Sequence, residues 1–139
     1  MVSLLLICVN IACADNERPI QVTELPATAQ QTLKQHFSER KVMLAKVENE
    51  VLSKSYEVFF ADGDHIDFDG KGNWKDIECP ATGVPAALVP AAITQYVKKN
   101  YPGETIKKIE KDRKEYEIKL SNRIELTFDT KFRLINMDM

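Results

Sequence analysis

The chain has 139 residues, of which 29% are charged, and its formal net charge is −2. This composition is typical of one soluble globular unit, or of two small units that share a core, and the length excludes a large multidomain enzyme. Nucleic-acid binding needs a basic face, so we expect no nucleic-acid partner. Two histidines and three cysteines offer few ligands, and we expect neither a metal site nor a cofactor.

Residues 1–14 contain no charged side chain and are dominated by an apolar run, Leu4 to Ile7. A run of about a dozen apolar residues is shorter than the ~20 that span a bilayer, so we expect no integral membrane span. The ending Ala12-Cys13-Ala14 is typical of the cleavage site of an export signal. We therefore predict an export signal over residues 1–14, a mature chain from Asp15, and a periplasmic or secreted location.

Cys13 supports a second interpretation of the same segment. Bacterial lipoprotein signals end in a small residue before a cysteine that becomes lipidated, and Ile11-Ala12-Cys13 resembles that ending. The alternative is therefore an outer-envelope lipoprotein anchored at Cys13, although Asn10 stands where such signals usually have leucine. A buried N-terminal strand is the third interpretation, and the polar residues after Ala14 count against it.

The remaining chain resembles a duplication, which is the first pattern to look for in a sequence. Leu25-Pro26 matches Val89-Pro90 at an offset of 64, and Phe68-Asp69 matches Phe128-Asp129 at an offset of 60. The change of offset makes the second copy about four residues shorter. We predict two repeats, residues 19–79 and residues 83–139.

Each repeat contains the same predicted elements in the same order. A helix begins near Pro26 and again near Pro90, because proline favours the first helical position and apolar residues follow at helical spacing. Alternating apolar and polar residues after each helix indicate strands, separated by Asp-Gly and Asn-containing turns. The strands are predicted over residues 42–51, 55–61, 65–68 and 74–79, and over residues 105–111, 116–120, 123–128 and 134–139.

The predicted fold class is α+β. A helix followed by an antiparallel meander packs as two layers, so one sheet face takes the helix and the other is open. We expect two tandem copies of a helix on a four-stranded antiparallel meander, which could join into one continuous curved sheet with the helices on one face. Alternation then places Glu57, Phe59, His65 and Asp67 on the face away from the helix.

The motifs Tyr56-Glu57-Val58, Ile66-Asp67-Phe68-Asp69 and Gly72-x-Trp74, with the helix-plus-meander pattern, resemble the beta-lactamase-inhibitor-like, PepSY-like family of bacterial envelope proteins. The resemblance covers essentially all of residues 19–139. It implies a tandem-repeat sheet whose concave face grips a protein, and a link to peptidase inhibition. The second repeat departs from the pattern, because Phe132 and Leu134 replace the glycine and the tryptophan.

Five residues are the candidate binding site: Phe59, Trp74, His65, Asp67 and Glu57. Phe59 falls on the open face by alternation, and Trp74, which follows a turn, could share it. Aromatic side chains exposed on a sheet are typical of binding surfaces. The alternative is that both aromatic rings pack against the other repeat or under a loop.

The acidic segment from Asp62 to Glu78 has two interpretations. Asp67, Asp69 and Glu78 follow the spacing of a calcium-binding loop, but Lys71 replaces an oxygen ligand and strands flank the segment instead of helices. Aspartate and glycine are also ordinary turn formers. Turn formation is therefore the preferred interpretation of this segment.

The mature chain offers no catalytic set that we can assemble from sequence. After cleavage only Cys79 remains, so no intramolecular disulfide can form, and its acidic neighbours Asp76 and Glu78 disfavour a thiolate. We predict a non-enzymatic exported module that binds an unknown protein or peptide of the cell envelope on the open sheet face. Inhibition of a hydrolase is the most specific form of this prediction. The alternative is a small-molecule or calcium-binding sensor module.

Overall fold

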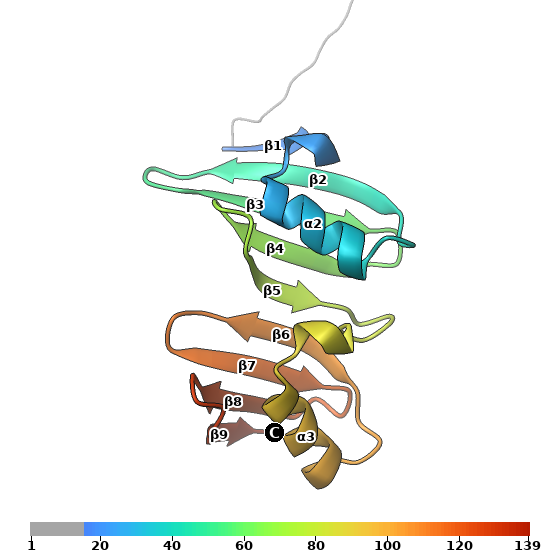
Figure 1. Ribbon diagram of the computed structural model, residues 1–139, viewed down its shortest axis with the longest axis vertical. Helices are drawn as coiled ribbons and strands as arrows, with labels where there is room; N and C mark the ends of the chain where they lie inside the picture. Colours follow the sequence, from blue (N-terminus) through green and yellow to red (C-terminus); the bar gives the residue numbers. More distant parts are fainter. Residues whose placement is uncertain (1–15) are drawn as a thin grey trace, which may run out of the picture.

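Nine antiparallel strands hydrogen-bond in chain order to form one sheet, from β1 at one edge to β9 at the other (Figure 1). The computed structural model describes residues 16–139, so the predicted export signal and Cys13 lie outside the described residues. Two α-helices, α2 (Ala27–His36) and α3 (Ala91–Asn100), complete the fold. The strands are β1 (Glu17–Ile20), β2 (Val42–Asn49), β3 (Lys54–Phe60), β4 (His65–Asp69), β5 (Trp74–Glu78), β6 (Ile106–Lys111), β7 (Glu115–Leu120), β8 (Glu125–Asp129) and β9 (Leu134–Asp138).

The predicted α+β class is confirmed, but the sheet is larger than either predicted meander. Four strands follow each helix, and all of them belong to the single sheet. The sheet also contains β1, which the sequence analysis missed and which pairs with β2 along its whole length. The internal duplication stays a prediction from the sequence offsets. Among the described residues, no helix is long and apolar enough to cross a membrane.

Both helices lie on the same side of the sheet (Figure 1). Each follows a proline at its N-cap, and each ends where the backbone N–H of an aromatic residue, Phe37 or Tyr101, donates back into the last turn. The helices bury their apolar stripes against every second residue of the strands. The fully buried strand residues are Val58, Ile66, Phe68, Ile77, Ile109, Ile118, Leu120, Leu126 and Phe128, with Ala29, Leu33, Ile93 and Val97 from the helices.

The pairing of β5 with β6 joins the two halves of the sheet. Ile77 lies opposite Ile109, and both side chains are fully buried, so one apolar core runs under both helices. The same pairing places Asp76 opposite Glu110 on the other face. One register therefore sets the core and the charged surface together, because neighbouring residues of a strand point to opposite faces.

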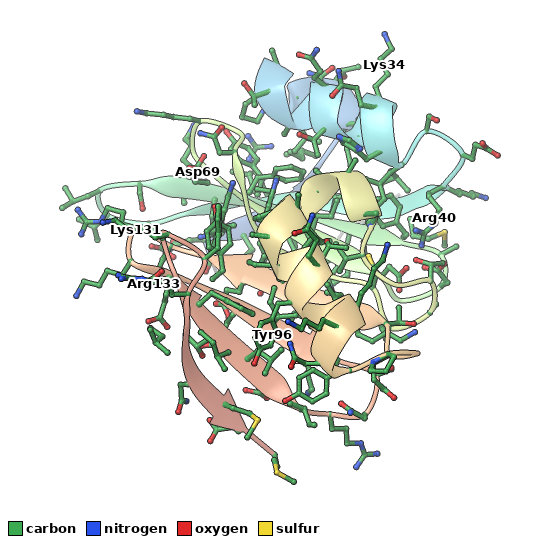
Figure 2. All side chains as sticks on the ribbon, turned by 60° about the horizontal axis from the view of Figure 1, so that its bottom comes forward. Lys34, Arg40, Asp69, Tyr96, Lys131 and Arg133 are labelled. Carbon is green, nitrogen blue, oxygen red and sulfur yellow. The ribbon has the colours of Figure 1, made fainter. Side chains whose placement is uncertain are left out.

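Asp64 is a fully buried carboxylate, with 0% of its surface exposed, in the turn between β3 and β4. Its oxygens accept hydrogen bonds from Arg40 Nη2 (2.8 Å), Thr82 Oγ1 (2.8 Å) and the Ala81 backbone N–H (3.0 Å). Burial opposes ionisation, but these donors outweigh it and hold the pKa of Asp64 below its usual value. Arg40, at the end of the loop after α2 (Figure 2), therefore ties this turn to the loop after β5.

Cys79 is buried beside Asp64 and Thr82. Burial, with the neighbouring Asp64 charge, raises the pKa of its thiol to about 12. A thiol in this state is protonated at neutral pH and is a poor nucleophile. This agrees with a structural cysteine.

Gly72 and Phe132 occupy corresponding turns, before β5 and before β9, and both have positive φ angles, +89° and +64°. In each turn an aspartate, Asp69 or Asp129, accepts two backbone N–H bonds through Oδ1. A Cβ at position 72 would lie 2.8 Å from the Cβ of Pro26, so the first turn packs directly on the start of α2. Glycine is required there by space as well as by backbone conformation.

We expect Arg40→Met to lower the free energy of unfolding by about 3 kcal/mol at pH 7, because it leaves the buried Asp64 charge without its partner. Urea denaturation measures the change. The control is Arg133→Met, which removes an ion pair whose arginine is 71% exposed and should cost less than about 1 kcal/mol. Equal losses in the two variants would contradict the role given to Arg40.

We expect Gly72→Ala to destabilise the protein by about 3 kcal/mol, since the substitution adds a clash with Pro26 to the cost of a positive φ. Gly63→Ala separates the two effects. Gly63 also has a positive φ (+93°), but an added Cβ meets nothing within 4 Å, so we expect a loss of only about 1 kcal/mol. Thermal unfolding of both variants should therefore rank Gly72→Ala as clearly the less stable.

Candidate functional site

The sheet face opposite the two helices, here called the open face, carries a line of five carboxylates. They are Glu57, Asp67, Asp76, Glu110 and Glu117, one from each strand from β3 to β7, and we call them the acidic row. Each residue lies directly opposite the next in the strand register. Like charges directly opposite each other destabilise a sheet, so the row opposes folding and needs a counter-charge.

Two oxygens at the centre of the acidic row lack partners. Oδ1 of Asp67 and Oδ1 of Asp76 are buried, and neither accepts a hydrogen bond from any described residue. A buried polar atom without a partner carries an unfavourable free energy of about 1–3 kcal/mol. A positively charged group that reached these two atoms would remove part of that cost.

The pKa values along the acidic row are raised. Burial, reinforced by the Glu57 carboxylate, raises the pKa of Asp67 to about 7, and the nearby His65 opposes the rise. Burial also raises the pKa of Asp76, which Lys108 partly offsets, and burial with Glu110 raises that of Glu117. Desolvation and like-charge repulsion both disfavour the ionised form, so the electrostatics match the geometry.

Basic side chains flank the acidic row but do not neutralise it. Lys46 Nζ lies 2.6 Å from Glu17 and 3.5 Å from Glu57, so its charge is shared between two strands. Lys108 Nζ lies 3.9 Å from the nearer oxygen of Asp76. Asp67 forms no ion pair with any described residue. The row therefore has more carboxylates than neighbouring cations, and Asp67 is a member without an ion-pair partner among the described residues.

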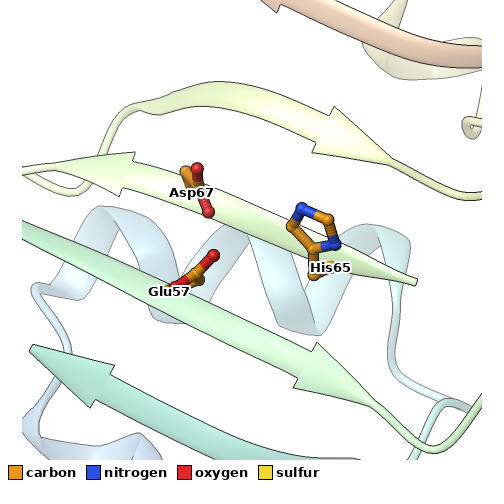
Figure 3. Close-up of side chains that lie close together, drawn as sticks. All are labelled: Glu57, His65 and Asp67. Carbon is orange, nitrogen blue, oxygen red and sulfur yellow. The ribbon is translucent and has the colours of Figure 1, made fainter. Parts of the chain in front are cut away.

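Glu57, His65 and Asp67 converge on this part of the face, and one ligand atom from each lies within 4.8 Å of the others (Figure 3). The Phe59 ring lies tilted by 35° beside the His65 ring at a centroid distance of 5.4 Å, and Lys46 Nζ lies 5.5 Å from the centre of the Phe59 ring. The structure thus brings together four of the five predicted site residues. The cluster offers carboxylates, an imidazole and one half-buried aromatic ring, which suits the binding of a cation.

A family model described as "Putative beta-lactamase-inhibitor-like, PepSY-like" matches residues 54–136. The chain belongs to this PepSY-like family. The matched residues include most of the strands, and with them all five residues of the acidic row. No curated protein matches the chain.

Three solved structures from Bacteroides species resemble the PepSY-like chain. A "putative calcium-regulated periplasmic protein" from Bacteroides thetaiotaomicron is 56% identical, with a TM-score of 0.87, and the match covers 88% of this chain and 97% of that one. A periplasmic protein from Bacteroides vulgatus is 48% identical, with a TM-score of 0.87 and coverages of 91% and 99%. Another from the same species, of unknown function, is 36% identical, with a TM-score of 0.83 and coverages of 88% and 99%.

Trp74 does not share the open face with Phe59, which corrects one part of the sequence interpretation. A β-bulge between Asp67 and Phe68 changes the register, so that Trp74 lies opposite the buried Phe68 and packs against the core. Lys111 Nζ covers the ring at 4.0 Å from its centre. A register change of one residue moves a side chain to the other face, and a bulge of this kind is not visible in the alternation pattern.

The three aspartate and glutamate residues with calcium-loop spacing have three different environments. Asp67 lies on the open face, whereas Asp69 accepts backbone N–H bonds inside the turn. Glu78 Oε1 lies 3.7 Å from His65 Nε2 on the next strand. The segment therefore consists of the end of β4, a turn and β5, and its spacing alone does not form a calcium loop.

Sequence reasoning missed Asp76, Glu110 and Glu117 as members of the site. The signal was present for all three, because each adjoins a buried isoleucine (Ile77, Ile109 or Ile118) and so must face outward. Their alignment with Asp67 depends on the β5–β6 register, which no local pattern fixes.

We expect Asp76→Asn to raise the free energy of unfolding by about 1 kcal/mol at pH 8, since it removes a like charge between two carboxylates. The raised pKa of Asp76 means that the native state binds the proton more tightly than the unfolded state. The unfavourable free energy of ionised Asp76 in the wild type therefore appears as the pH rises from about 4. The stability gained by Asp76→Asn should shrink at lower pH. Urea denaturation at pH 8 and pH 5 measures it.

Asp112→Asn is the matched control, because we expect it to change the free energy of unfolding in the opposite direction. Backbone N–H bonds from Lys114 and Glu115 lower the pKa of Asp112, so its ionised form favours folding. We expect this variant to lose stability at pH 8. A destabilising Asp76→Asn, or a gain that does not change with pH, would contradict the electrostatic account of the acidic row.

Proposed function

We propose that this PepSY-like protein is a non-enzymatic module of the periplasm that binds a positively charged segment of a protein or peptide on its open face. The observation that carries the proposal is the acidic row, five carboxylates placed opposite one another on five neighbouring strands. Opposite charges across an interface guide association and select partners. A basic segment would also supply the counter-charge that the row lacks.

The spacing of the acidic row suggests the shape of the bound segment. Neighbouring strands are about 4.8 Å apart, so five carboxylates span roughly 19 Å across the sheet. An extended peptide rises about 3.3 Å per residue, and six residues cover that length. We therefore infer an extended segment of about six residues with lysine or arginine at alternate positions, since alternate side chains point to one side.

Phe59 extends the proposed surface beyond the charges. Its ring is half-buried between His65 and Lys46 and adjoins the row at Glu57. The long side chains of lysine and arginine carry apolar stems, and a half-buried ring provides a surface for them. Binding would then combine charge with a small apolar contact.

A periplasmic location is supported by three similar structures, each described as a periplasmic protein. The apolar, uncharged residues 1–14 provide the export signal that such a location requires. Attachment through a lipid at Cys13 is the alternative to a soluble product. The family description, "beta-lactamase-inhibitor-like", supports a more specific form of protein binding, inhibition of a hydrolase. In that form we infer that the open face is the contact surface.

The test is capture from a periplasmic extract of the source organism with the immobilised mature protein, followed by quantitative mass spectrometry. The face variant is Glu110→Gln/Glu117→Gln, which removes two charges from the row. The control is Glu39→Gln/Glu104→Gln, which removes two charges outside the row, from the exposed Glu39 in the loop after α2 and the half-buried Glu104 in the loop after α3. Wild type and control should capture the same basic protein or peptide, and the face variant should capture at least about tenfold less.

Salt provides a second readout. Capture should weaken steeply between about 50 and 500 mM salt, because exposed charge interactions are screened. Capture of no basic partner, or equal capture by the face variant, overturns the proposal. In that case a rise in melting temperature with millimolar Ca²⁺ would favour the alternative, a calcium-binding sensor module.

A further inference from the structure

The cluster of Glu57, His65 and Asp67 has the composition and placement of a metal site. Glu57 on β3 lies directly opposite Asp67 on β4, and His65 precedes Asp67 by two residues, so all three side chains share the open face. One ligand atom of each lies within 4.8 Å of the other two (Figure 3). Two carboxylates and one imidazole, all strong metal ligands, therefore lie close together on one hairpin.

One carboxylate oxygen of this cluster lacks a hydrogen-bond partner. Oδ1 of Asp67 is buried and accepts no hydrogen bond from a described residue, although Glu57 brings a second carboxylate beside it. Lys46, which forms an ion pair with Glu57 at 3.5 Å, forms a shorter one with Glu17, at 2.6 Å between Nζ and Oε1. A bound dication would satisfy the Asp67 oxygen and neutralise the two facing carboxylates.

The donor set selects the class of metal. Calcium prefers six to eight oxygen ligands, whereas an imidazole nitrogen suits Zn²⁺ and similar transition metals. We propose that Glu57, His65 and Asp67 bind a transition-metal dication of the Zn²⁺ class, with water completing the coordination. This inference goes beyond the proposed function and does not depend on it.

The geometry requires a small closure on binding. Tetrahedral Zn²⁺ holds nitrogen and oxygen ligands at about 2.0–2.2 Å, which places them roughly 3.4 Å apart, less than the 4.8 Å limit found here. The side chains can close this gap because they lie at the surface, with His65 22% and Glu57 30% exposed. Glu78 Oε1, 3.7 Å from His65 Nε2, adds a carboxylate on the β5 side that can steady the ring.

The test is isothermal titration of the metal-free mature protein, without a histidine tag, with Zn²⁺. We expect one Zn²⁺ per chain and a weakening of more than about tenfold in His65→Gln. His36→Gln is the matched control, because it removes the other histidine of the chain from α2 and should leave Zn²⁺ affinity unchanged. Circular dichroism in EDTA establishes that both variants fold.

Two further measurements distinguish the metal and the site. Excess Ca²⁺ should not displace Zn²⁺, and Glu110→Gln/Glu117→Gln should bind Zn²⁺ like the wild type, whatever happens to its protein partner. The proposal is overturned if wild type binds no Zn²⁺ below about 100 µM, if His65→Gln binds as well as wild type, or if His36→Gln loses binding. Displacement by Ca²⁺ would overturn the assignment to the Zn²⁺ class.

Discussion

The pairing of β5 with β6 is the constraint on which the other features of this protein depend. Three residue pairs form it, Asp76 with Glu110, Ile77 with Ile109 and Glu78 with Lys108. Ile77 and Ile109 close the apolar core beneath the two helices. The outward pairs extend the charged surface from one half of the sheet to the other. A slip of one residue would bury the charges and expose the isoleucines.

The open face carries a cost in stability that the protein avoids elsewhere. Its acidic row places like charges in contact and leaves two carboxylate oxygens without partners, although lysines stand nearby. Elsewhere in the same chain a buried carboxylate, Asp64, is fully satisfied by Arg40, Thr82 and a backbone N–H. The contrast supports the proposal that the row binds a ligand, since local conflicts of this kind concentrate at functional sites in proteins.

Much of the fold follows from local patterns in the sequence. The two prolines locate the helix starts, and alternation locates eight of the nine strands within a few residues. β1 was missed because its sequence, from Glu17 to Ile20, has no apolar alternation, and its pairing with β2 defines it. The α+β class and the family needed no more than these patterns and the motifs around Tyr56 and Phe68.

The site was predictable only in part, because it depends on long-range register. Alternation correctly placed Glu57, Phe59, His65 and Asp67 on one face. The bulge beside Phe68 moved Trp74 to the core, and no local signal marks a bulge. The expectation of no metal site came from counting histidines and cysteines, and it stays a prediction. Such a count does not see that a hairpin brings one histidine close to two carboxylates.

The central claim is that the open face holds carboxylates whose charge the protein itself does not compensate. Carbon-detected NMR titration of the aspartate and glutamate carboxyl groups, in metal-free protein, measures this directly. The account predicts that Asp67 titrates near pH 7 and that Asp129, held by backbone N–H bonds, titrates below its usual value. If Asp67 and Asp76 titrate near pH 4 like exposed carboxylates, the acidic row is already neutralised and the account is wrong.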